Sequence, residues 1–214
     1  MTSRNRSDRR RFLATTAAGL AMYPVCSLAE ALKRTPGEAL GPYYPVAQRL
    51  PHTHDMTHPA GAKGTATGEL LHISGRVLAR DGRPVPLARI EIWQANAAGR
   101  YNHPSDRSGL ALDENFQGAA EFETDAEGRY AFRTVKPGPY PGEHGMRTRH
   151  IHYQVTGRYD RLVTQAYFPG EPLNATDFFL SHETRPQDLM LRFAQAVPGG
   201  AAHEATFDLV LGVG

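Results

Sequence analysis

Cysteine is nearly absent from this sequence. Its 214 residues include one cysteine, Cys26, which lies in an N-terminal segment with the composition of an export signal. We therefore expect the mature chain to contain none, which excludes disulfide bonds and thiolate metal ligands. A lipid anchor on Cys26 is the weaker interpretation, because Val25 precedes it where a small residue is expected.

Long hydrophobic runs and long helical periods are missing as well. The most apolar N-terminal stretch, residues 12–29, is short, mildly apolar and interrupted by Pro24, so a permanent transmembrane helix is the weaker interpretation. We expect no membrane span once the signal is removed. There is no convincing internal repeat, and the length suits one domain with a single sizeable core.

The net charge of the chain is small when the N-terminal 29 residues are counted separately. The formal net charge is +2 at pH 7, but five arginines and one aspartate give +4 in the first 29 residues, which leaves −2 for the remainder. This distribution indicates no nucleic-acid partner.

Residues 1–29 predict a twin-arginine export signal. The pair Arg9-Arg10 precedes an alanine-rich apolar run, and that run reaches a small-x-small cleavage pattern ending at Ala29. We expect cleavage after Ala29 and a periplasmic or secreted protein.

Residues 30–68 predict an irregular N-terminal arm, because proline and glycine interrupt the segment repeatedly. The arm contains a second histidine group, His52, His54 and His58. A histidine-rich surface loop is the better interpretation, since only Asp55 supplies a hard anionic ligand nearby. No metal is assigned to it.

Residues 69–214 predict one all-β domain. Two turn signals, Asp81-Gly82 and residues 125–128, each follow one predicted strand and precede another, which predicts two hairpins. Short strands at this spacing favour an antiparallel β-sandwich with the irregular arm in front of it. The predicted strands are residues 72–78, 89–93, 122–124, 130–134, 150–156, 162–168, 189–194 and 205–211.

Four side chains in this domain suggest an iron site: Tyr101, Tyr140, His150 and His152. The two histidines are two residues apart, so on an extended strand both imidazoles point to the same face and can reach one ion. Phenolate is a hard anionic donor that suits ferric iron, and four such ligands leave a coordination position open. Copper or zinc is the alternative, since imidazole accepts either metal.

Five motifs resemble those of the intradiol ring-cleavage dioxygenases. They are residues 93–101, 112–116, 136–141, 150–152 and 164–168. The resemblance runs in order and spacing from about Thr35 to Asp177, and five separate motifs make it specific. Within the family, the likeness is strongest to the iron-bearing subunit of protocatechuate 3,4-dioxygenases, and the wording around the histidines is closer to secreted single-chain members.

The resemblance implies a non-haem Fe(III) enzyme. Such an enzyme cleaves a catechol-type small molecule between its two hydroxylated carbons and inserts both atoms of O2, which gives a cis,cis-muconate-type dicarboxylate. Export of a folded protein suits a site that must receive iron before it meets tighter-binding metals outside the cytoplasm. Family members commonly assemble, which favours a homo-oligomer.

The resemblance also implies roles for single residues. Tyr101, His150 and His152 match permanent iron ligands, and Tyr140 matches the ligand that leaves when substrate binds and then acts as a base. Other matches are an active-site arginine, Arg147, a polar residue beside the site, Gln165, and a pocket-lining segment that contains Pro42 and Tyr43.

Three alternatives stay open at this stage. Arg149 could replace Arg147 as the active-site arginine, although the spacing favours Arg147. Residues 142–149 depart from the two-subunit members of the family, which leaves the substrate undetermined. The rival class of protein is a non-catalytic transthyretin-like β-sandwich module, which has no reason to place two tyrosines and a His-x-His together.

Overall fold

The computed structural model describes residues 31–46, 49–195 and 202–213. The predicted export signal, residues 1–29, lies outside the described residues. In the described ranges, no helix has the length and apolar character needed to cross a membrane.

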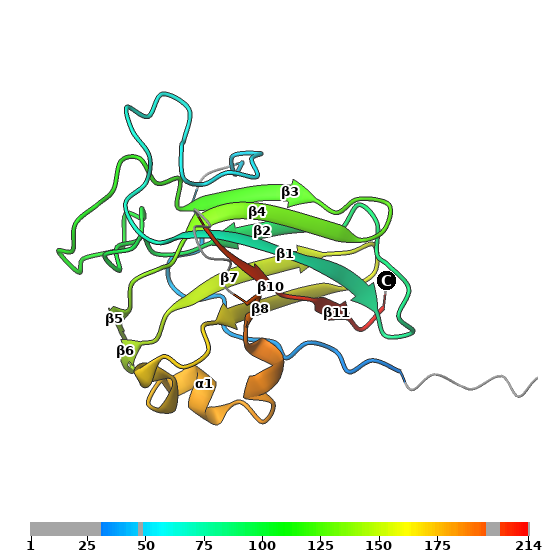
Figure 1. Cartoon of the computed structure of the whole chain (residues 1–214). Coiled ribbons are helices and arrows are strands. Elements are labelled where there is room, and N and C mark those ends of the chain that lie inside the picture. The colour runs from blue at the N-terminus through cyan, green and yellow to red at the C-terminus, as the bar shows by residue number, and fades with distance from the viewer. Residues whose placement is uncertain (1–30, 47–48, 196–201, 214) are drawn as a thin grey trace, which may run out of the picture.

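Two β-sheets are stacked face to face (Figure 1). The first sheet has the order β11-β1-β10-β9, and β4 also pairs with β1. The second sheet has the order β3-β2-β7-β8. Their strands are β1 (Leu70–Ala79), β2 (Arg89–Trp93), β3 (Ala119–Glu123), β4 (Arg129–Val135), β7 (His150–Thr156), β8 (Arg161–Tyr167), β9 (Arg192–Phe193), β10 (His203–Thr206) and β11 (Leu209–Leu211). The predicted all-β sandwich is confirmed.

The hydrophobic core lies between the sheets because alternate residues of each strand point inward. On β7, Ile151, Tyr153 and Val155 belong to this core and are fully buried. The intervening residues, His150 and His152, point to the outer face of the same strand, yet they are buried too. A second layer of loops must therefore cover the outer face of the β2-β7-β8 sheet.

That layer comes from the arm and from the long connections. The described arm residues, 31–46 and 49–68, run along the sheet edges, where the Thr35 N–H donates to the Val210 carbonyl and the Glu38 N–H donates to the Val163 carbonyl. Next to them lie a short hairpin, β5 (Tyr140–Gly142) and β6 (Gly145–Arg147), the 3-10 turns η1 (Pro172–Ala175) and η2 (Pro186–Leu189), and one helix, α1 (Phe178–His182).

The two predicted hairpins are wrong in their pairing. The turns form, since Gly82 N–H bonds to the Ala79 carbonyl and Gly128 N–H to the Asp125 carbonyl, but β1 and β4 belong to one sheet while β2 and β3 belong to the other. Each turn therefore carries the chain across the sandwich. The first crossing passes through Leu87, which has a positive φ of 53°.

The C-terminal strands also differ from the prediction. Residues 189–194 contribute only β9, because η2 occupies Pro186–Leu189. The strand expected over residues 205–211 is two strands, β10 and β11, and both pair in parallel with β1. The break falls at Asp208, whose side chain accepts a hydrogen bond from the Arg76 backbone N–H.

Candidate active site

Two histidines of β7 form the centre of the site. The Nε2 atoms of His150 and His152 lie 3.1 Å apart, as expected for residues on one face of a strand. Nδ1 of His150 is 2.7 Å from the Thr148 carbonyl, which can only accept, so this nitrogen carries the proton and Nε2 keeps a free lone pair. Trp93 of β2 pairs with His152 and stacks on it at 4.8 Å, which fixes the ring.

Two tyrosines reach the same point from loops. Tyr101 follows β2 and Tyr140 begins β5; their rings lie 5.1 Å apart, edge to face. The Oη of Tyr140 is 3.4 Å from Nε2 of His150. The two loops touch closely, because the Gly138 N–H donates to the Asn96 carbonyl and a Cβ built on Gly99 would lie 2.3 Å from the Pro139 oxygen.

Burial gives all four groups an unusual electrostatic environment. It raises the pKa of Tyr101 well above its usual value and also raises that of Tyr140, because a phenolate is costly to desolvate. Burial lowers the pKa of His150 and His152 well below the usual value. The four side chains therefore favour their uncharged forms unless a cation offsets the charge of a phenolate.

A ferric ion fits this donor set. Among the described side chains, Tyr101 Oη is a buried polar atom without a hydrogen-bond partner, and a buried polar atom of this kind calls for an explanation such as a bound ion. Phenolate oxygens suit a hard trivalent ion, and neutral imidazoles are ready to coordinate. The described residues contain no cluster of three or more His, Cys, Asp or Glu, so a metal site here depends on the tyrosines.

A cavity of about 440 Å³ meets the cluster of four side chains at Tyr140. Tyr140 lines it and Tyr101 does not, so only one of the two phenols faces this space. The predicted pocket residues Pro42 and Tyr43 also line it. Tyr43 stacks on Tyr101 at 4.5 Å and thereby closes the site on the side of the arm.

Arg147 lines the same cavity, in register with Tyr140 across the β5–β6 hairpin. Its Nε donates to Asp177 at 2.8 Å and its Nη2 donates to Gln165 at 2.7 Å, and all three side chains are buried. Arg149 lies elsewhere, in a salt bridge of 3.1 Å with Glu171. The geometry thus brings Arg147, and not Arg149, to the site.

Several residues that support the site were not predicted from the sequence. Asp177 holds Arg147 and also caps α1, and Phe179 lies under the guanidinium at 4.5 Å. Glu38 lies 3.5 Å from the Tyr167 Oη, and burial raises its pKa to about 7. An aspartate just before a short apolar segment is a helix-cap signal, but nothing local links any of these residues to Arg147.

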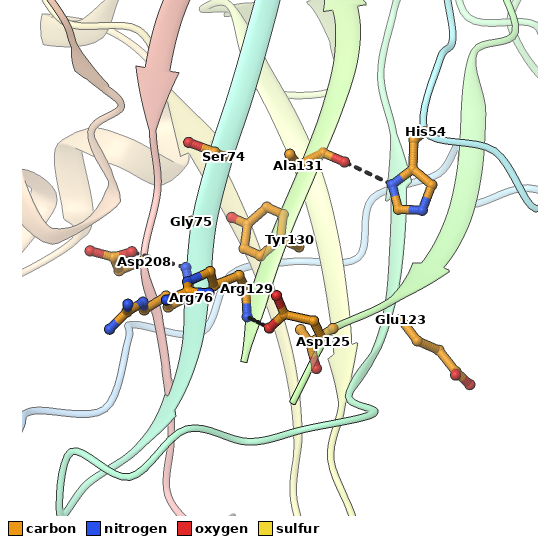
Figure 2. Close-up of a pocket in the computed structure, with 11 residues that line it drawn as sticks. His54, Ser74, Gly75, Arg76, Glu123, Asp125, Arg129, Tyr130, Ala131 and Asp208 are labelled. Atoms are coloured by element: carbon orange, nitrogen blue, oxygen red, sulfur yellow. Dashed lines mark hydrogen bonds between the residues drawn. The ribbon is translucent and has the colours of Figure 1, made fainter. Parts of the chain in front are cut away.

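A larger hollow of about 890 Å³ lies on another part of the molecule (Figure 2). It runs between β1, β4 and the turn that follows β3, and none of the predicted site residues lines it. His54, from the histidine-rich loop, lies at its border, where Nδ1 is 2.8 Å from the Ala131 carbonyl and the ring stacks on Phe122.

Comparisons with known proteins point to one family. A family model described as Dioxygenase matches residues 40–213. The protocatechuate 3,4-dioxygenase beta chain of Burkholderia cepacia is 43% identical over 196 residues, which cover 88% of this chain and 82% of that protein. Catechol 1,2-dioxygenase 2 of Acinetobacter lwoffii is 33% identical over 159 residues, which cover 67% of this chain and 54% of that protein.

Solved structures agree with these matches. The dioxygenase domain of a dioxygenase carbohydrate-binding protein fusion from Streptomyces sp. SirexAA-E superposes with a TM-score of 0.66 and 31% identity, covering 85% of this chain and all of that domain. Catechol 1,2-dioxygenase from Acinetobacter sp. ADP1 superposes with a TM-score of 0.65 and 28% identity, covering 84% of this chain and 63% of that one. This chain spans about half to two thirds of the length of these catechol dioxygenases.

Proposed function

The chain belongs to the intradiol ring-cleavage dioxygenases, and from that premise we propose which of its residues perform the reaction. It is an oxidoreductase that cleaves a catechol-type ring between the two hydroxylated carbons and incorporates both atoms of O2, which gives a cis,cis-muconate-type dicarboxylate. The observation that carries the residue assignment is the convergence of two phenols and two imidazoles on one buried point beside a cavity.

Tyr101, His150 and His152 are the proposed permanent ligands of a non-haem ferric ion, and Tyr140 is the fourth, displaceable ligand. The family uses non-haem iron. A ferric ion held there would supply Lewis acidity and draw electron density from a bound catecholate, which activates the ring toward O2. The unpartnered oxygen of Tyr101 and the neutral imidazoles support this assignment.

Tyr140 is the proposed general base. A catechol must lose two protons to chelate a metal, and the Oη of Tyr140 borders the cavity that would admit the substrate. One hydroxyl proton of the catechol would pass to this oxygen, and the second would pass to solvent. Tyr101 lines no part of that cavity, which supports a permanent role for it.

Arg147 is the proposed electrostatic stabiliser of the reaction. Negative charge develops on the ring during attack on O2, and a guanidinium beside the ring lowers the energy of that charge. Asp177 and Gln165 hold the guanidinium at a fixed position, so it need not reorganise during the reaction. Gln165 is a positioning residue in this proposal, while Pro42 and Tyr43 form the substrate-facing wall.

Isotope labelling tests the reaction. The iron-loaded protein should convert catechol, under ¹⁸O2, to a dicarboxylate that carries both labelled oxygens. A semialdehyde product would mean cleavage outside the diol, and unchanged catechol together with stoichiometric iron would contradict the proposed function.

The proposal includes export by the twin-arginine route to the periplasm or the outside of the cell, with a homo-oligomeric mature protein. The sequence of residues 1–29 supports the export route. The assembly is supported by the family, whose members often form oligomers. Changing Arg9 and Arg10 together to lysine should leave the precursor in the cytoplasm, and unaltered export of that variant would show that the leader works in another way.

A further inference from the structure

The cavity beside Tyr140 is larger than an unsubstituted catechol requires. Its volume of about 440 Å³ lies within the ~300–1,000 Å³ of pockets that hold drug-sized ligands. If the two hydroxyls face Tyr140 and the buried donor cluster, the far side of the ring faces the turn of the β5–β6 hairpin, where Glu143 and His144 line the cavity. A substituent on that side of the ring would therefore meet these residues.

The charges along the wall are unevenly distributed. Among the described residues that line the cavity, Arg147 and Glu143 are the only arginine, lysine, aspartate or glutamate. Arg147 is already paired with the buried Asp177 at 2.8 Å, and it lies beside Tyr140, at the reacting end. Glu143, in the turn of the hairpin, is exposed and makes no salt bridge with the described residues. The far end thus carries one uncompensated negative charge.

Apart from His144, the remaining lining is aromatic or apolar and includes Pro42, Tyr43 and Phe179. His144 packs on Phe178 at 4.4 Å, which joins the β5–β6 turn to α1. Such a lining binds alkyl and aryl groups by burying their surface. Its one arginine, Arg147, is already paired with Asp177, so a carboxylate at the turn finds no free arginine or lysine among the described lining residues to replace its lost hydration.

From this lining we infer that the preferred substrates are catechols whose ring substituent is uncharged and apolar, such as alkyl or aryl catechols, and that a carboxylate substituent is disfavoured. The inference rests on the proposed function, since it concerns the same cavity. It separates this chain from its 43% identical relative, which is named for protocatechuate, a catechol with a carboxylate substituent.

A size-matched series of substrates tests the inference. The series is 4-propylcatechol, 3-(3,4-dihydroxyphenyl)propionate and 3,4-dihydroxyphenethylamine, which carry a neutral, an anionic and a cationic chain, with catechol as the reference. Two quantities are measured on the iron-loaded protein: kcat/KM in air, and the dissociation constant by anaerobic calorimetry. All compounds are compared at the same pH, pH 8.

The neutral compound should have a higher kcat/KM and a lower dissociation constant than the anionic one. The cationic compound should differ from the anionic one in the same two directions. Glu143→Gln should raise the anion-to-neutral ratio, defined as kcat/KM for the anionic compound divided by kcat/KM for the neutral one, by roughly five- to tenfold. This is the size expected for one charge pair near contact in a partly hydrated site. Glu123→Gln, an exposed carboxylate on β3, is the matched control, and its ratio should equal that of the wild-type enzyme.

Two results would overturn the inference: tighter binding of the anionic compound by the wild-type enzyme, or an anion-to-neutral ratio that Glu143→Gln leaves unchanged. Failure of the proposed function looks different. In that case catechol itself is bound without cleavage, while the order of dissociation constants still reports on the wall of the cavity.

Discussion

The Oη of Tyr140 lies 3.4 Å from Nε2 of His150, so a residue of the short β5–β6 hairpin reaches a histidine on the outer face of β7. Both phenols are buried, but Tyr140 lines the substrate-sized cavity and Tyr101 does not. The two phenols therefore differ in access, although both belong to the same cluster. This difference gives them separable roles.

Replacing each phenol separately tests these roles. Tyr101→Phe removes an enclosed anionic ligand, so it should lower iron retention. Tyr140→Phe should keep iron and bind catechol, but turn over roughly 10²–10⁴-fold more slowly, because the base is lost. Its catechol binding should shift to higher pH, where catechol ionises unaided. The measurements are the iron content and the pH profile of catechol binding, made for both variants side by side. If Tyr140→Phe loses its iron while Tyr101→Phe keeps it, the assigned roles of the two tyrosines are reversed.

Arg147 and Arg149 provide a matched pair of substitutions. Arg147→Lys keeps a positive charge but cannot reproduce the contacts with both Asp177 and Gln165, so kcat should fall by about 10² or more. The iron content should stay at the wild-type level. Arg149→Lys, in the Glu171 salt bridge outside the cavity, should change kcat by less than about threefold. The opposite pattern would identify Arg149 as the active-site arginine.

Glu38 predicts a pH dependence of stability. Burial raises its pKa from 4.5 to about 7, so between these values the folded state holds a proton that the unfolded state releases. Stability from this group is therefore fully present below about pH 4.5 and is lost as the pH rises through 7. Relative to the wild-type protein, Glu38→Gln should gain urea resistance between pH 5 and pH 8. Glu114→Gln, at an exposed carboxylate, should show no such gain, and parallel curves for both variants would refute the prediction.

Gly99 allows the Tyr101 loop to lie close to the Tyr140 loop. It has a φ of 87°, and a Cβ there would lie 2.3 Å from the Pro139 oxygen, whereas Gly109, with a φ of 71°, has open space around it. Gly109→Ala should cost only the ~1–2 kcal/mol of a left-handed alanine. Gly99→Ala adds a steric penalty of about 1–3 kcal/mol and should also lower iron retention. Thermal unfolding and iron content test this, and equal effects of the two substitutions would contradict it.

The sequence predicts the four candidate metal ligands better than it predicts the residues that hold the site in place. The spacing of His150 and His152 is sufficient, since a strand of period two places both rings on one face. The meeting of Tyr101 with Tyr140 depends on contacts across 39 residues of chain, which only the family resemblance could indicate. Asp177 reaches Arg147 from a helix cap, and Glu38 reaches Tyr167 from the arm; no local pattern encodes such contacts.

The assignment of strands to the two sheets could be predicted only in part, for a similar reason. Turn residues such as Asp81-Gly82 specify a tight reversal of the chain, but a reversal can lead to a neighbouring strand or to the opposite sheet. The positive φ at Leu87 and the pairing of β2 with β7 decide for the opposite sheet. The parallel pairing of β10 and β11 with β1 depends equally on distant segments.

The visible absorption spectrum of the iron-loaded protein tests the central claim most directly, because it reports on metal and phenolate ligands together. Two tyrosinate ligands on ferric iron predict a red-brown protein, from phenolate-to-iron charge transfer, and a changed spectrum when catechol is added without O2. A colourless protein that contains stoichiometric iron would contradict the account.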